Sequence, residues 1–133
     1  MFRRGRRLRV NSVIRDLVRE NTLSVNDFIY PVFIVEGSDI KREISSLKGN
    51  YHWSVDRLYE LVQELNEAKV KSVILFGIPD HKDCKGSEAY NDDGIVQKAI
   101  RKLKELNRDL YIITDVCMCE YTDHGHCGIL NGR

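Results

Sequence analysis

The chain has 133 residues, of which 42% are hydrophobic and 31% are charged. Its 21 lysine and arginine residues nearly balance its 20 aspartate and glutamate residues, so the formal net charge is +1. This length and composition are typical of one soluble globular domain, or of part of one. The charge balance argues against a protein that binds polyanions over its whole surface, because such domains are usually strongly basic.

The sequence carries no signal that directs the chain to a membrane or out of the cell. Its start, MFRRGRRLRV, is basic but lacks the apolar core and cleavage site of a secretory signal. No apolar run approaches the ~18–20 residues that a membrane span requires. We therefore expect a cytoplasmic protein with no membrane partner.

Residues 1–24 are predicted to form an arm. Five of the first nine residues are arginine, and a short apolar stripe follows at helical spacing. The stripe consists of Val13, Ile14, Leu17 and Val18. It predicts a short amphipathic helix that is too small to fold alone, so we expect it to pack against another surface.

The first predicted strand lies at residues 28–35, where FIYPVFIV is an almost continuous apolar run. Such a run is typical of a strand that is buried on both faces, as in a parallel sheet. Pro31 has no backbone N–H, which favours an edge position or a local irregularity at that point. Residues 36–53 contain glycines, serines and charges, and are predicted to form a long loop with at most short ordered pieces.

Two helices and two further strands are predicted after this loop. Ser54 is the expected N-cap of the first helix. The apolar faces of the two helices are predicted to be Val55, Leu58, Leu61, Val62, Leu65 and Ala68, and then Ile95, Ala99, Ile100, Leu103 and Leu106. Strands are expected at residues 72–77 and 110–116. The alternation implies a parallel sheet with right-handed crossovers, and it leaves one edge unpaired and only one face well covered.

Three cysteines lie within eleven residues after the last predicted strand. Cys117 and Cys119 are two residues apart, so in extended backbone their side chains point the same way. Cys127 follows after a loop in which Gly125 and Gly128 allow tight turns. In a reducing cytosol, such clusters are more often metal ligands or catalytic groups than disulfides. Three thiolates suit Zn²⁺, although the spacing differs from the paired C-x-x-C of common structural zinc sites.

The residues alone leave the role of this cluster open. Three ligands leave a fourth position free, as in a catalytic zinc site, whereas His124 or His126 could close an inert Cys₃His site. Asp115 lies at the carboxyl end of the last predicted strand, where barrel and doubly wound enzymes place their active sites. It could contact a substrate amine or relay a proton, or it could only cap the local backbone.

Residues 115–128 read DVCMCEYTDHGHCG and resemble the zinc loop of the porphobilinogen synthase (5-aminolevulinate dehydratase) family. The resemblance extends over nearly the whole chain, through RRLRVN, FIYPVFIVEG, LFGIPDHKDCKGSEAYNDDGIVQKAIRKLK and LYIITDV. It implies an α/β fold that comprises the first three β/α units of a TIM (β/α)₈ barrel, preceded by an extended N-terminal arm. Residues 1–24 would be the arm with its short helix, and residues 25–133 a partial barrel ending in a Cys-rich metal loop.

The resemblance also implies an activity. A zinc-dependent dehydratase (a lyase of haem and porphyrin biosynthesis) would condense two molecules of 5-aminolevulinate to porphobilinogen. Cys117, Cys119 and Cys127 would bind Zn²⁺, Asp115 would line the pocket beside them, and the arm would hold a homo-oligomer, an octamer, together. The family's Schiff-base lysines lie on later strands, beyond Arg133, so the isolated 133-residue chain is expected to be inactive.

Two other functions are weighed against this one. A small zinc-binding interaction module could use its basic arm to bind nucleic acid. However, the rest of the chain cancels the charge of the arm, and no aromatic residues are interleaved with the arginines, so we expect no nucleic-acid partner. A nucleotide-binding domain is excluded because no glycine-rich phosphate loop follows any predicted strand. Cys84 is an additional thiol outside the cluster, expected to be inert.

Overall fold

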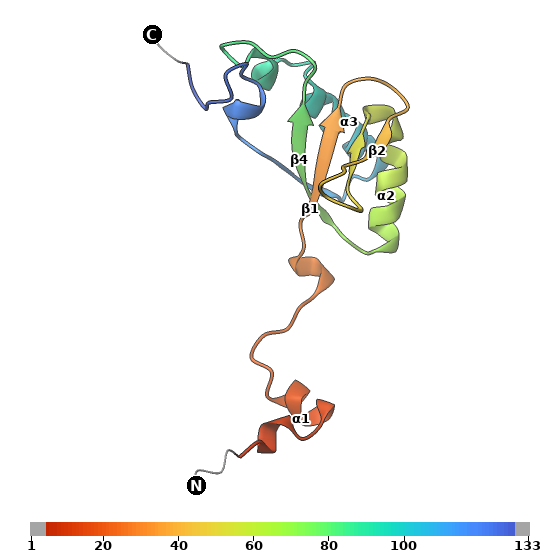
Figure 1. The fold of residues 1–133 in the computed structure, drawn as a ribbon. Helices are drawn as coiled ribbons and strands as arrows, with labels where there is room; N and C mark the ends of the chain where they lie inside the picture. The colour runs from red at the N-terminus through yellow and green to blue at the C-terminus, as the bar shows by residue number, and fades with distance from the viewer. Residues whose placement is uncertain (1–4, 130–133) are drawn as a thin grey trace.

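The computed structural model describes residues 5–129, and within them the strands form one five-stranded mixed sheet in the order β2-β3-β1-β4-β5 (Figure 1). The predicted strands are present as β1 (Tyr30–Val35), β4 (Ser72–Ile78) and β5 (Tyr111–Thr114). They run parallel, with Val32 opposite Leu75 and Ile74 opposite Ile113. The parallel part of the sheet thus follows the prediction.

The predicted loop at residues 36–53 contains two strands that the sequence analysis missed. β2 (Lys41–Glu43) pairs antiparallel with β3 (Tyr51–Trp53), and β3 pairs parallel with β1. The prediction of an all-parallel sheet is therefore wrong at this edge. Both strands are only three residues long, and β2 is entirely charged, so neither shows the apolar alternation by which a strand is recognised.

Pro31 lies in an interior strand of the sheet. Nevertheless, β3 pairs with β1 only at Phe33 and Ile34, so at Pro31 the strand β1 has β4 as its single neighbour. Its surroundings are those of a strand edge, where the missing N–H of proline is tolerated. The predicted local irregularity is present, because β3 begins to pair with β1 only two residues after Pro31.

Two helices, α2 (Leu58–Glu67) and α3 (Ile95–Leu106), cover one face of the sheet. The side chains of β1 and β4 that face them, Val32, Ile34, Val73 and Leu75, are at most 1% exposed. The helix residues of this core are Leu58, Leu61, Val62, Leu65, Ile95, Val96, Ala99 and Leu103. On the other face no helix packs within residues 5–129, and the half-buried rings of Phe33 and Phe76 stack 5.4 Å apart. One face is covered, as predicted.

Ser54 does not cap α2 with its side chain. A 3₁₀ turn (Val55–Arg57) precedes the helix, and the Ser54 hydroxyl instead accepts a hydrogen bond from the N–H of Ile40 at 2.9 Å. Ser54 is fully buried, so this bond ties the start of the helix to the loop before β2. The prediction that the helical segment begins at Ser54 is correct. The partner of the Ser54 hydroxyl was not predicted, because Ile40 is distant in the sequence.

The N-terminal segment extends away from the amino ends of the strands (Figure 1). Its helix α1 (Ser12–Leu17) begins at Asn11, whose side chain accepts the N–H of Ile14 at 2.9 Å. The apolar side chains Val13 and Leu17 are 65% and 79% exposed, so the rest of the described chain leaves the predicted stripe uncovered. Among residues 5–129, no helix combines the length and apolar character that crossing a bilayer demands.

Candidate metal centre

The cysteine loop, residues 115–128, follows β5 directly. The N–H of Asp115 still donates to the carbonyl of Leu75 on β4, at 3.3 Å, and a 3₁₀ turn (Met118–Glu120) begins after Cys117. Gly125 and Gly128 have φ values of 72° and 141°, a region that residues with side chains rarely adopt. These turns fold the loop back at the carboxyl end of the parallel strands (Figure 1).

The loop brings the three predicted cysteines together. The Sγ atom of Cys117 lies 2.8 Å from that of Cys119 and 3.3 Å from that of Cys127. All three sulfurs lie within 4.8 Å of one another, and among the described residues this is the only group of three or more potential ligands so arranged. The distances exceed the ~2.05 Å of a disulfide bond, so the cysteines are free thiols.

The donor set fits a zinc ion. Zinc–sulfur bonds of ~2.3 Å in tetrahedral geometry place two sulfurs ~3.8 Å apart, so the cluster accommodates the ion after small movements of the thiols. Cys117 and Cys119 are half-buried and Cys127 is exposed, which leaves one side of the cluster accessible. Three sulfur donors with an accessible side are compatible with an ion that also contacts a small molecule.

Hydrogen bonds between the thiols change their acidity. The Cys117 sulfur is within hydrogen-bond distance of the sulfurs of Cys119 and Cys127, and these hydrogen bonds raise the pKa of Cys117 to about 12. The hydrogen bond with Cys117 lowers the pKa of Cys127, because it stabilises a thiolate at Cys127. Three thiolates at these distances repel one another, so a divalent cation is needed to hold all of them in ionised form.

The two histidines of the loop do not join the sulfur cluster. Nδ1 of His124 accepts the N–H of His126 at 3.2 Å, and the two rings stack with their centroids 5.8 Å apart. Neither imidazole belongs to the group of ligand atoms within 4.8 Å. The structure therefore assembles the three sulfurs without a histidine, and the Cys₃His arrangement is not formed. Cys84 is exposed and also lies outside the cluster.

Asp115 lies where the sequence placed it, at the carboxyl end of β5. It lines a hollow of about 320 Å³ together with Cys117 and Tyr121. Burial raises the pKa of Glu120, and the charge of Asp115 raises it further, whereas Lys82 lowers it. Burial also raises the pKa of Tyr121, with the charges of Glu120 and Asp115 adding to the shift. Sequence reasoning missed Glu120 and Tyr121. Their position in the polar loop between Cys119 and Cys127 does not indicate that their side chains are removed from water.

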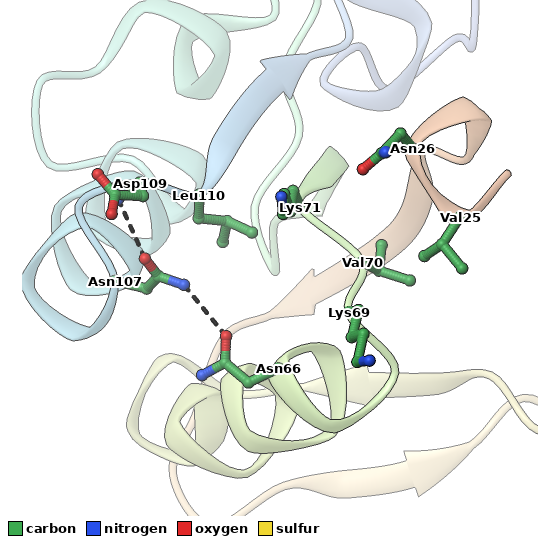
Figure 2. Close-up of a pocket in the computed structure, with 9 residues that line it drawn as sticks. All are labelled: Val25, Asn26, Asn66, Lys69, Val70, Lys71, Asn107, Asp109 and Leu110. Atoms are coloured by element: carbon green, nitrogen blue, oxygen red, sulfur yellow. Dashed lines mark hydrogen bonds between the residues drawn. The ribbon is translucent and has the colours of Figure 1, made fainter.

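A larger hollow, of about 480 Å³, lies at the opposite end of the strands (Figure 2). It is lined by residues that precede β4 and β5, such as Lys71 and Leu110, and the side-chain amide of Asn107 donates to that of Asn66 there at 3.3 Å. Parallel sheets of enzymes place their chemistry at the carboxyl ends of the strands. The hollow beside the cysteines is therefore the better candidate for a reaction site.

A family model described as delta-aminolevulinic acid dehydratase matches residues 2–133. The chain belongs to this family. Curated relatives of that name are 56% identical in Ruminiclostridium josui, 52% in Methanothermus sociabilis and 53% in Helicobacter pylori strain J99. The matches cover 100%, 99% and 98% of this chain, but only 65%, 41% and 41% of the relatives. The chain thus spans less than two thirds of the length of these family members.

A solved structure shares the fold of the chain. It is the delta-aminolevulinic acid dehydratase (porphobilinogen synthase) of Toxoplasma gondii ME49, in complex with the reaction product porphobilinogen. The TM-score is 0.90 at 32% sequence identity, and the match covers 98% of this chain and 38% of that chain. The described α/β fold is therefore that of the corresponding part of a porphobilinogen synthase.

Proposed function

We propose that the protein containing this sequence condenses two molecules of 5-aminolevulinate to porphobilinogen, with loss of water. The observation that carries the proposal is the convergence of three sulfurs within 4.8 Å at the carboxyl end of β5, in a chain of the delta-aminolevulinic acid dehydratase family. The family match over residues 2–133 also favours this enzyme over a small interaction module with a nucleic-acid-binding arm.

In this proposal Cys117, Cys119 and Cys127 bind a zinc ion. A zinc ion held by these residues would supply Lewis-acid chemistry toward a carbonyl or an amine of the substrate. The three residues contribute thiolates from one short loop, and the exposed side of Cys127 leaves room for a substrate group next to the ion. Zinc is the metal of choice because thiolates are soft ligands and because tetrahedral sulfur coordination suits it.

Asp115 is the residue proposed to contact the substrate. Asp115 lines the hollow beside Cys117 together with the buried Tyr121. A carboxylate there can accept a hydrogen bond from a substrate amine and favours the charged, ammonium form of that amine. Glu120 adds a second carboxyl group nearby, whose pKa is already raised by burial.

The remaining part of the proposal concerns the larger fold. The arm (residues 1–24) and the partial barrel (residues 25–133) would form the first three β/α units of a TIM barrel. Two observations support an incomplete barrel: β5 is an open edge of the sheet, and the face carrying Phe33 and Phe76 has no covering helix within residues 5–129. The Schiff-base lysines would lie on later strands, so the 133-residue segment alone would be inactive.

The arm is proposed to hold a homo-oligomer, an octamer, in the cytoplasm. Its apolar side chains Val13 and Leu17 are exposed, although burying a leucine side chain contributes ~1.5–3 kcal/mol. A second subunit is the surface that could cover them. The arginines of the arm would then meet acidic groups of that subunit.

Activity measurements with matched variants test the proposal. The natural protein containing this sequence should form porphobilinogen from 5-aminolevulinate, lose this activity when zinc is removed by a chelator, and regain it when zinc is returned. Cys127→Ser should abolish zinc-dependent activity, whereas Cys84→Ser, at an exposed thiol outside the cluster, should not. The proposal is wrong if zinc-loaded protein forms no porphobilinogen. The assignment of the lysines is wrong if the 133-residue segment alone is active.

A further inference from the structure

The loop that follows β4 packs against the cysteine loop. The carbonyl of Asp83 accepts the N–H of Asp123 at 3.1 Å, and Asp83 and Thr122 form an isolated parallel bridge. Gly86 has a φ of 63°, and a Cβ atom there would lie 2.6 Å from Cε of Met118. The two loops are therefore in close contact, although Thr122 comes 39 positions after Asp83 in the sequence.

The Asp83 carboxylate fixes the shape of its own loop. One of its oxygens accepts the N–H groups of Lys85 and Ser87, at 2.9 and 3.0 Å, and the other accepts the Ser87 hydroxyl. These three bonds close a turn over residues 83–87. The turn sets the direction of the Asp83 carbonyl, which is the group that pairs with the cysteine loop.

Thr122 continues this chain of contacts toward the metal ligands. Its side chain is buried, with 2% exposure, and its hydroxyl donates to the carbonyl of His126 at 3.0 Å. The N–H of Gly128 donates to the same carbonyl at 3.1 Å. The peptide that begins at this carbonyl leads directly into Cys127. The hydroxyl therefore holds the backbone on the amino side of the third cysteine.

Cys127 depends on such support more than the other two cysteines. Cys117 and Cys119 follow β5 within a few residues and are half-buried, whereas Cys127 is exposed and lies between the glycine turns at Gly125 and Gly128. A ligand on such a loop is brought to the cluster only if the backbone before it is held. Groups that orient metal ligands in this way typically change metal affinity by about 10- to 100-fold when they are removed.

We propose that Asp83 and Thr122 are positioning residues of the metal centre, which hold the Cys127 sulfur beside those of Cys117 and Cys119. Asp83 acts through the turn at residues 83–87 and its carbonyl, and Thr122 acts through the His126 carbonyl. The inference rests on the proposed zinc-binding function and extends it to a loop that contributes no ligand. It predicts that thiolate coordination is lost when either contact is cut.

Cobalt substitution in the natural protein tests this inference, because Co²⁺ absorbs in the near ultraviolet in proportion to the number of thiolates bound to it. Thr122→Val keeps the shape of the side chain and removes the hydroxyl, and Asp83→Asn weakens the turn. Both should lower the affinity for Co²⁺ about tenfold. Both should also lower the absorption per bound ion by about one third, the value that Cys127→Ser should give on losing one of three thiolates. Thr122→Ser keeps the hydroxyl, so its affinity for Co²⁺ and its absorption per bound ion should match those of the wild type.

Asp80→Asn is the matched control for Asp83→Asn, since Asp80 is an exposed carboxylate of the same loop. It should leave the affinity and the absorption unchanged. If Thr122→Val and Asp83→Asn both match the wild type in absorption per bound ion and in affinity, the positioning roles are wrong. If the wild type itself shows no thiolate-to-cobalt absorption, the proposed metal centre is wrong. Should Thr122→Val fail to fold, Asp83→Asn compared with Asp80→Asn decides the question.

Discussion

The covered face of the sheet and the cysteine loop are stabilised by different interactions. On the covered face, the apolar side chains of β1, β4, α2 and α3 are removed from water, and the same burial that folds the chain also fixes their positions. In the cysteine loop, hydrogen bonds and two glycine turns fix the backbone, while the three sulfurs repel one another once they ionise. The covered face needs no ligand to keep its shape. If the loop binds a cation as proposed, we expect it to gain order on binding.

This difference means that substitutions in the two regions should be detected by different measurements. A core substitution should lower the free energy of unfolding and leave the affinity for zinc unchanged in the folded protein. A substitution in the loop should lower zinc affinity with little change in global stability. A single substitution that lowered the free energy of unfolding and the free energy of zinc binding by equal amounts would show that the two regions are not independent.

Removing a cysteine ligand should have the largest effect. Cys127→Ser should lower zinc affinity by about 100- to 1000-fold, because structural zinc sites with several thiolates gain several kcal/mol per ligand. Competition with a chromophoric chelator measures the affinity. Cys84→Ser is the control, because Cys84 is an exposed thiol outside the cluster. An equal loss of affinity in Cys84→Ser would place that thiol at the metal.

A core substitution should have the next largest effect, on stability. Leu103 is fully buried between α3 and the sheet, so Leu103→Ala should lower the free energy of unfolding by about 2–5 kcal/mol. Leu17 in the arm is 79% exposed, and Leu17→Ala should change the free energy of unfolding of the chain by less than about 0.5 kcal/mol. Urea unfolding compares the two leucines directly.

The same leucine pair also tests the proposed role of the arm. If the arm holds subunits together, Leu17→Ala should shift the natural protein toward smaller oligomers in sedimentation velocity, although it leaves the fold of each chain intact. Leu103→Ala should not dissociate oligomers under conditions in which it is folded. An unchanged oligomeric state in Leu17→Ala would show that α1 packs elsewhere.

Zinc removal should affect the two regions unequally. Without the ion, the backbone amides of residues 117–128 should exchange hydrogen more rapidly, since the charged sulfurs no longer share a cation. The amides of β1 and β4 should exchange at the same slow rate with and without zinc, because apolar burial protects them. Hydrogen exchange followed by mass spectrometry provides the comparison. Faster exchange in β1 on zinc removal would mean that the metal also stabilises the sheet.

Sequence reasoning identified the covered face well because apolar periodicity and burial have the same physical cause. Leu58, Leu61 and Leu65 were expected on one helix face, and the structure buries them there. The three sulfurs were also expected to converge, and they do, although Cys119 lies in a 3₁₀ turn and not in the extended backbone on which that expectation rested. β2 and β3 were missed because their pairing depends on contacts between charged or short segments, which leave no periodic pattern.

The contacts around the metal centre were also beyond sequence reasoning. The bond from the Ser87 hydroxyl to Asp83 and the bridge from Asp83 to Thr122 depend on how two loops meet in three dimensions. Composition marks residues 83–87 as a polar loop and gives no sign that this loop contacts the cysteine loop. The three clustered cysteines are thus visible in the sequence, whereas the residues proposed to hold them in place are recognised only in the fold.

The pH dependence of stability should show the smallest effect and should be confined to the loops. Hydrogen bonds from Ser87 and the neighbouring N–H groups lower the pKa of Asp83 to about 2. Because this value lies below the usual ~3.9 of an unfolded aspartate, the ionised carboxylate stabilises the folded protein. The contribution is complete above about pH 5 and is lost as the pH falls toward 2.

Asp83→Asn should therefore unfold at a lower urea concentration than the wild type at pH 7, and the two midpoints should converge as the pH falls. Ser87→Ala keeps the carboxylate and removes its main donor, so its midpoint should lie between the other two at pH 7. A difference between the wild type and Asp83→Asn that stays constant from pH 7 to pH 2 would show that the carboxylate charge does not stabilise the turn.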